Sequence, residues 1–292
     1  MNDNHYCLHS QQMFYNVPMK LINILLALLL ITERSLACDF AEDSSRIAVG
    51  GGSITEILYF LGAEEKIVAV DITSNYPTSA TSLPSIGYVR NLSTEGILSL
   101  SPTLVIGEDD MGPSDVIAQI ENSGVDIISV EEQHNSNGIL AKIRCVANVV
   151  GSQTKANTLI EQQLLPVIQR LENQAKSVRQ QQQSVLFILS MNAGSPIVAG
   201  KNVSANGLIN MLGARNSMLS FDGWKPANVE AIIAAAPDVI LISNRGLEGI
   251  GDLSELRSHP TLRLTPAAQT GKIFAMDGMA LLGFVQERCQ QR

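Results

Sequence analysis

The sequence predicts an α/β protein of two lobes with parallel sheets, joined by one long linker helix, with a ligand cleft between the lobes. Short apolar segments alternate with amphipathic ones from Arg46 onward; a polar, glycine-free segment interrupts this alternation, which then resumes. Strands that alternate with helices are typical of βα units in a parallel sheet. We therefore expect an N-terminal lobe over residues 38–151, a linker helix over 152–183 and a C-terminal lobe over 184–292.

The first 37 residues have the pattern of a secretory signal peptide. Lys20 precedes a run of eleven residues, 21–31, that are apolar except for Asn23, and Ser35 and Ala37 follow as the small residues of a cleavage site. Such a run is too short to span a bilayer but suits the centre of a signal peptide. We expect residues 1–37 to be removed and the mature protein to reside in the periplasm.

Two alternatives remain open at this end of the chain. Met19 stands directly before Lys20, so translation can start there instead of at Met1. Cys38 follows the expected cleavage site directly, as the lipid-bearing cysteine of a lipoprotein does. Because Ser35 stands where lipoprotein signals usually carry leucine, we expect a lipoprotein less than a free periplasmic protein.

The composition excludes nucleic acid as a partner, and the cysteines do not indicate a metal site. The chain has 292 residues, 45% of them hydrophobic, and a formal net charge of -8, so counterion-driven binding to nucleic acid has no source. The cysteines after residue 37 are Cys38, Cys145 and Cys289, an odd number at wide spacings that predicts neither a metal motif nor a disulfide framework. We expect Cys145 to be a small buried apolar residue.

The expected elements of the N-terminal lobe follow one another as strand and helix. The expected strands are 46–50, 66–71, 103–107 and 126–130, and the expected helices are 54–62, 95–101, 114–124 and 138–151. Between the first strand and the first helix, the triple glycine 50–52 is expected to form a tight turn that admits a flat ligand. Ser53 is expected to cap that helix.

The polar segment 152–183 is expected to form one extended helix, on the order of 45 Å long. Pro166 should kink it, because proline lacks the backbone N–H that a helix interior uses. Beyond the linker, the expected strands of the C-terminal lobe are 184–190 and 237–243, and the expected helices are 205–213 and 229–236.

The two halves contain a repeated helix-to-strand segment. Glu95 and Pro102 are seven residues apart, and so are Glu230 and Pro237; each glutamate opens a helix and each proline leads into an apolar strand. A glutamate in a first helical turn is favoured by the helix dipole. Its recurrence in both lobes indicates a shared role.

These residues resemble the periplasmic haem-binding proteins of bacterial ABC import systems, within the helical-linker class that also serves cobalamin and siderophores. The resemblance covers nearly the whole mature chain, and its most specific parts are "GYVR" at 87–90 and "MALLGF" at 279–284. It implies two Rossmann-like lobes joined by a rigid linker helix. It also implies a protein without enzymatic activity that captures ferric haem b and delivers it to an ABC permease and its ATPase, with an outer-membrane haem receptor upstream. Relatives usually continue further past the second motif, so the C-terminus is expected to be shortened.

The resemblance assigns haem ligation to the turn at 87–90. It implies that Tyr88 is the axial ligand of the haem iron. A phenolate is a hard, anionic ligand that suits ferric iron, and tyrosine is an established axial ligand. A free phenol ionises only near pH 10, but Fe³⁺ and a nearby guanidinium stabilise the phenolate. Arg90 is therefore expected to hydrogen-bond the phenolate or to pair with a haem propionate.

Four further residues take roles from the same resemblance. Arg245, just after a C-terminal-lobe strand, resembles a propionate-binding arginine. Met191 stands where some relatives carry a histidine ligand, and it is a candidate either for iron ligation or for core packing. Glu95 and Glu230 match the lobe-surface glutamates that meet arginines of the permease in this class.

Three other functions remain as alternatives. The same fold serves cobalamin or ferric siderophores, although a corrin carries its own cobalt ligands and does not need a phenolate. A secreted hydrolase lacks support, since no GxSxG motif is present and Ser53 has no evident histidine partner. A zinc or manganese site needs histidines beside carboxylates. The acidic loop 107–112 offers carboxylates alone, so we expect it to be a solvated rim of the cleft.

Overall fold

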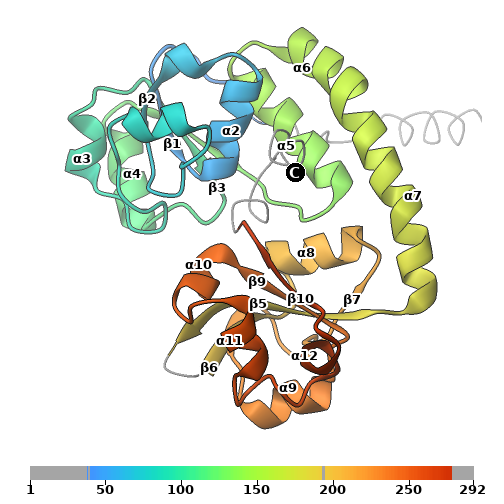
Figure 1. Ribbon diagram of the computed structural model, residues 1–292. Coiled ribbons are helices and arrows are strands. Elements are labelled where there is room, and N and C mark those ends of the chain that lie inside the picture. Colours follow the sequence, from blue (N-terminus) through green and yellow to red (C-terminus); the bar gives the residue numbers. More distant parts are fainter. Residues whose placement is uncertain (1–37, 39, 193–194, 278–292) are drawn as a thin grey trace, which may run out of the picture. The chain divides into compact units, whose positions relative to one another are not determined.

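The computed structural model describes residues 38, 40–192 and 195–277 (Figure 1). The expected signal peptide, the MALLGF segment, Cys289 and the expected shortened C-terminus lie outside the described residues. Within the described part of the chain, no helix is both long enough and apolar enough to cross a membrane.

The first sheet has four parallel strands in the order β2-β1-β3-β4, as the alternation predicted. Its strands are β1 (Ile47–Gly50), β2 (Ile67–Val70), β3 (Leu104–Glu108) and β4 (Asp126–Val130). The α-helices between and after them are α2 (Gly52–Phe60), α3 (Thr94–Leu98), α4 (Ser114–Asn122) and α5 (Ser136–Val149), with short 3-10 turns η1 (Glu64–Lys66) and η2 (Thr78–Ser82).

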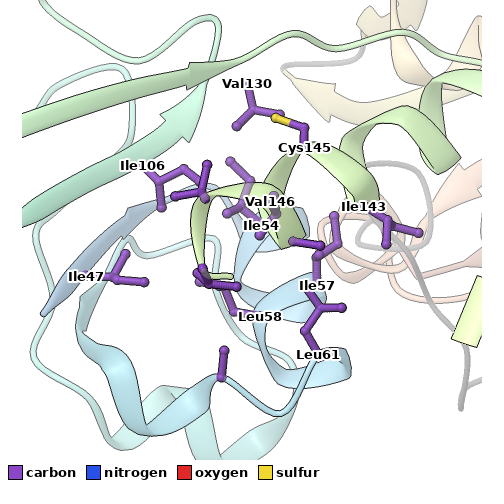
Figure 2. Packing of buried hydrophobic residues seen from close by; sticks show 14 of the residues in the cluster. Ile47, Ile54, Ile57, Leu58, Leu61, Ile106, Val130, Ile143, Cys145 and Val146 are labelled. Carbon is purple, nitrogen blue, oxygen red and sulfur yellow. The ribbon is translucent and has the colours of Figure 1, made fainter. Parts of the chain in front are cut away.

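Apolar side chains cover both faces of this sheet. Ile47 and Val49 of β1 belong to the core under α2 and α5, while Ala48 between them belongs to a second cluster with residues of α3 and α4. Figure 2 shows side chains of α2 and α5 directed toward those of the strands. Because both faces are buried, the strands read as continuous apolar runs.

The linker is helical from Gln153 to Gln181, and consists of α6 (Gln153–Leu159), a π-helical turn η3 (Ile160–Leu164) and α7 (Leu165–Gln181). Figure 1 shows α6 and α7 one after the other along the linker. Pro166 lies in the first turn of α7, directly after the π-helical turn. A proline there does not end the helix, because a widened turn precedes it. Ile160 and Leu164 pack into the core of the first sheet.

The second sheet is mixed, so the prediction of a purely parallel sheet in the C-terminal half is wrong in part. Strands β5, β9 and β10 are parallel, but β6 pairs antiparallel with β5 and with β8. The strands are β5 (Ser184–Asn192), β6 (Ser195–Ala199), β7 (Arg215–Asn216), β8 (Trp224–Pro226), β9 (Val239–Ser243) and β10 (Ile273–Met276). The helices are α8 (Ser204–Met211), α9 (Val229–Ala235), α10 (Asn244–Glu248), α11 (Leu253–Ser258) and α12 (Pro266–Thr270).

A disulfide joins Cys38 to Cys145 of α5, across 107 residues of sequence. The prediction that Cys145 serves only as a small buried apolar residue is therefore wrong, although it does lie in the core of the first sheet. The side-chain amide of Asn148 also donates a hydrogen bond to the carbonyl of Cys38 at 3.0 Å. These two contacts hold Cys38 against α5.

Candidate functional site

Tyr88 lies in a turn at the carboxyl edge of the first sheet. The preceding segment pairs with the end of β2, where Ile86 N–H donates to the carbonyl of Val70 at 2.9 Å. The turn closes with a hydrogen bond from Asn91 N–H to the carbonyl of Tyr88 at 2.7 Å. Gly87, just before the tyrosine, has φ of +87°, a left-handed conformation that favours glycine. The carboxyl ends of parallel strands are where α/β proteins hold ligands.

The loop after β3 braces this turn from the other side. Gly112 N–H donates to the carbonyl of Val89 at 3.0 Å, and Leu92 N–H donates to the carbonyl of Gly112 at 2.9 Å. The side chain of Val89 is buried. A Cβ added to Gly50 would lie 3.2 Å from it, so the glycine at the end of β1 leaves room for this anchor. The expected turn of the triple glycine thus supports the Tyr88 turn through packing.

Arg90 lies beside Tyr88 in the same turn. Its Nη1 donates a hydrogen bond to the phenolic Oη of Tyr88 at 3.3 Å, and its Nε donates to Oδ2 of Asp110 at 2.6 Å. Arg90 and Asp110 also form an ion pair through Nη2. Burial alone would lower the pKa of the Arg90 guanidinium, but the hydrogen bond and charge of Asp110 outweigh it and raise that pKa. Arg90 therefore holds its charge against the phenol.

Two side chains in these loops are exposed although they are apolar or aromatic. Tyr88 is 39% exposed and Ile72 is 65% exposed. Ile72 N–H donates to the carbonyl of Gly87 at 2.8 Å, so the two side chains come from adjoining segments. The edge thus presents an apolar group, a phenol and a cation together.

A buried polar network lies behind this edge. Lys142 of α5 is 6% exposed, donates from Nζ to Ser53 Oγ at 2.9 Å, and forms an ion pair with Glu132. Ser53 Oγ donates in turn to Glu108 Oε1 at 2.6 Å. The expected N-cap role of Ser53 is wrong: Gly51 is the N-cap of α2, and Ser53 lies inside the helix. The helix start is held instead by Asp71, whose Oδ1 accepts from Gly51 N–H at 3.1 Å.

The acidic loop 107–112 is only in part the solvated rim that was expected: Asp109 is exposed, but Glu108 is largely buried. Only 17% of the Glu108 side chain is exposed. Burial raises the pKa of Glu108 from 4.5 to about 7, although Lys142 and the Ser53 hydrogen bond act in the opposite direction. The gap left by Gly51, at φ of +126°, explains how the carboxyl fits: a Cβ there would come within 2.9 Å of its atoms.

Glu95 and Glu230 occupy the same position in the two repeated segments. Each is the second residue of its helix, with a capping side chain two residues before it: Ser93 for α3 and Asn228 for α9. In each segment the residue before the proline has positive φ: Ser101, at 47°, lies three residues after the end of α3, and Ala236, at 41°, is the C-cap of α9. Both glutamates are exposed. The repeat inferred from the sequence is thus also a repeat of backbone conformation.

The second sheet carries the other two candidates. Arg245 is exposed on α10, directly after the carboxyl end of β9. Met191 is on β5 opposite Pro196 of β6, partly buried, and packs against the apolar core of this sheet. That packing favours the core interpretation of Met191 over iron ligation.

Comparison with known proteins places the chain in a family. The family profile described as "Periplasmic binding protein" matches residues 47–280. The chain belongs to this family. The aligned part of the chain spans 61% of a Bacillus subtilis relative, an ABC transporter substrate-binding lipoprotein called YvrC, at 26% identity over 66% of this chain. The match to the vitamin B12-binding protein of Yersinia pestis is 32% identical but covers 37% of this chain and 38% of that protein.

Among solved periplasmic binding proteins, several similar ones are haem-binding. The heme-binding protein BhuT, solved with two hemes, has a TM-score of 0.74 at 35% identity over 82% of this chain and 92% of its own. RhuT from Roseiflexus sp. RS-1 has a TM-score of 0.73 at 35% identity, over 82% of this chain and 92% of its own. HutB of Vibrio cholerae has a TM-score of 0.70 at 33% identity, over 84% and 95%. The two-sheet α/β fold with a long connecting helix agrees with this family.

The structure brings Tyr88 and Arg90 together as the sequence predicted, and adds Asp110 and Ile72 to the same edge. Sequence reasoning missed both additions. Asp110 was set aside with its acidic loop, and an exposed isoleucine after a strand gives no signal of its own. Within the described ranges, no cluster of three or more histidine, cysteine or acidic residues is arranged to hold a metal ion.

Proposed function

We propose that this chain is the substrate-binding protein of an ABC importer that captures ferric haem, with Tyr88 as the axial ligand of the iron. The observation that carries the proposal is the hydrogen bond from Arg90 to the phenol of a half-exposed Tyr88 at the carboxyl edge of the first sheet. The haem-binding relatives of similar fold support haem as the ligand class. The protein performs no chemical step on its cargo.

The donor set suits ferric haem. A phenolate oxygen is anionic and binds ferric iron, and the Arg90 guanidinium stabilises the phenolate. Exposed Ile72 offers an apolar contact for a flat porphyrin. Arg245 is the proposed partner of a propionate, since a guanidinium matches a carboxylate in a bidentate pair. Met191 remains the secondary candidate for a sixth ligand.

Cobalamin or a ferric siderophore is the second candidate, favoured by the partial match to vitamin B12-binding proteins. The Tyr88 and Arg90 pair argues against it. A corrin already carries cobalt ligands, so it leaves the phenol without a metal to bind. The relatives named for cobalamin also match a smaller share of this chain than the haem-binding structures do.

The proposed partners are a permease and its ATPase, supplied with haem by an outer-membrane receptor. Glu95 and Glu230 are proposed to meet arginines of the permease, one from each sheet. Both project from the first turn of a capped helix, which fixes the backbone beneath the carboxylate. Each helix is also anchored by a fully buried isoleucine, Ile97 or Ile232.

The proposed location is the periplasm, with the protein free in solution. One relative carries the name of a lipoprotein, so a lipid on Cys38 is the alternative. The sulfur of Cys38 is bonded to Cys145. A sulfur in a disulfide has no valence left for a thioether to lipid, which supports the free form.

A competitive titration tests the proposed ligand. The mature protein, purified from the periplasm and freed of ligand, is titrated in parallel with ferric haem, cyanocobalamin and a ferric siderophore. We expect saturable binding of haem alone. Binding of cobalamin or siderophore with no response to haem would replace the first candidate by the second.

A further inference from the structure

Arg90 lies between two oxygen atoms of unlike chemistry. Nη1 donates to the phenol of Tyr88, while Nε and Nη2 engage a single carboxylate oxygen, Oδ2 of Asp110. The Arg90 side chain is 59% exposed, and that of Asp110 33%. A long exposed arginine loses rotamer freedom when it is held in one geometry. Something must therefore fix Arg90 if it is to support a ligand reliably.

We propose that Asp110 is a positioning residue of the haem site, which holds Arg90 against the Tyr88 phenolate and thereby slows release of the iron. This inference rests on the proposed function and names a further residue of the same site. Asp110 does not act on the ligand itself. It acts through the guanidinium.

The backbone makes this arrangement rigid. Asp110 lies two residues before Gly112, whose N–H and carbonyl bond to Val89 and Leu92 on either side of Arg90. The loop and the turn are thus tied together at two points around the ion pair. These hydrogen bonds keep the backbone of Asp110 at a fixed distance from the backbone of Arg90.

The second oxygen of the Asp110 carboxylate, Oδ1, also favours a positioning role over a purely structural one. Oδ1 of Asp110 is buried and has no hydrogen-bond partner among the described residues. Burying a carboxylate oxygen unpaired is costly, so this acid is poorly placed for a purely structural role. Its hydrogen bond and ion pair both go to Arg90 through Oδ2, which offsets that cost only while Arg90 stays in place. The guanidinium is then preorganised before the ligand arrives, and preorganisation favours slow dissociation.

Haem dissociation in four variants tests the inference. Asp110→Asn removes the charge and keeps the shape, Arg90→Gln removes the guanidinium, a third variant carries both, and Asp109→Asn is the control. Asp109 is the neighbouring acid, and its Oδ2 accepts only a long bond, 3.5 Å, from Glu132 N–H. Transfer of haem to an excess of a scavenger gives the rate. We expect Asp110→Asn to release haem about tenfold faster, the loss typical of one charged hydrogen bond.

The double variant separates positioning from mere support of the loop. If Asp110 acts through Arg90, adding Asp110→Asn to Arg90→Gln changes the rate no further. Additive effects, or a rate for Asp110→Asn equal to that of Asp109→Asn, would overturn the inference while haem binding by the wild type still upholds the proposed function.

A measurement on the ligand-free protein tests the positioning of Arg90 even if the chain binds no haem. In the ligand-free protein, the ¹⁵N resonance of Arg90 Nε, assigned by its loss in Arg90→Gln, should be sharp in the wild type and averaged in Asp110→Asn. An equally averaged resonance in both proteins would refute the positioning whatever the chain binds. A wild type that binds no haem would refute the proposed function, and with it the role in haem release.

Discussion

Lys142 Nζ donates a hydrogen bond to Ser53 Oγ at 2.9 Å, and so connects α5 to the first turn of α2 behind the Tyr88 edge. The ammonium group is buried, and buried charges need paired and hydrogen-bonded partners. Glu132 and Glu108 lie on either side as those partners. The carboxyl edge of the first sheet is therefore supported by charges whose balance depends on the protonation of Glu108.

Stability should depend on pH through Glu108. Its pKa is about 7 in the folded protein against an ordinary 4.5, so the folded state binds the proton more tightly. The stability from this proton is full below pH 4.5 and is lost as pH rises through 7. We expect Glu108→Gln to match the wild type near pH 4.5 and to exceed its unfolding free energy by about 3 kcal/mol at pH 8.5. Urea unfolding at several pH values measures the difference; one that stays constant with pH would contradict the assignment.

The disulfide should contribute strongly to stability. A closed loop of 107 residues restricts the unfolded chain, and the entropic model assigns such a loop about 5 kcal/mol. Cys145→Ser should lower the unfolding free energy by roughly that amount, and reducing agent should then change the variant little. Intact mass of the periplasmic protein should show two missing hydrogens and no acyl chains. A diacylglyceryl mass on Cys38 would refute the disulfide in the mature protein.

The turn before Tyr88 should not tolerate a side chain. Gly87→Ala forces a residue with a Cβ to adopt φ of +87°, at a cost of about 1–2 kcal/mol, and should weaken haem binding. Gly124→Ala is a matched control, since Gly124 has φ of +86° and its added Cβ would meet nothing within 4 Å. Both variants should lose similar stability by thermal unfolding. Equal haem affinity in the two would show that the shape of the Tyr88 turn does not matter.

Transport should require the two glutamates together, independently of binding. We expect Glu95→Ala with Glu230→Ala to abolish haem uptake by cells while the purified protein keeps its affinity. Glu161→Ala removes an exposed glutamate from the linker and serves as the control. Both substituted sites are exposed, so unfolding free energy should change by less than about 1 kcal/mol. Wild-type uptake in the double variant would exclude these glutamates from the permease interface.

The sequence was sufficient for the order of strands and α-helices around the first sheet and for the repeat around Glu95 and Glu230. Strong apolar runs and helix caps are local signals, and they held for nearly all of the first sheet. The β5–β6 hairpin was missed because "SPIVA" carries only a short strand pattern after a strand of its own. Because a parallel sheet was expected throughout, an antiparallel strand directly after β5 was not considered.

The site was predictable only where residues are neighbours in the sequence. Tyr88 and Arg90 stand two apart, so their pairing could be anticipated. Asp110 contacts Arg90 from 20 residues further along the chain, and Cys38 is bonded to Cys145 across 107 residues. Contacts between residues so far apart in the sequence produce no local sequence pattern. The burial of Glu108 also has no sequence signal, because it depends on the space left by Gly51 in a different loop.

The central claim is that the phenol of Tyr88 binds the iron of ferric haem, and visible spectroscopy of the haem-loaded wild type and of Tyr88→Phe tests it most directly. Phenylalanine keeps the ring and removes only the oxygen, so the fold should be unchanged. We predict a tyrosinate-type ferric spectrum in the wild type that is lost in the variant, together with a large fall in affinity. An unchanged spectrum and affinity in Tyr88→Phe would contradict the claim and direct attention to Met191.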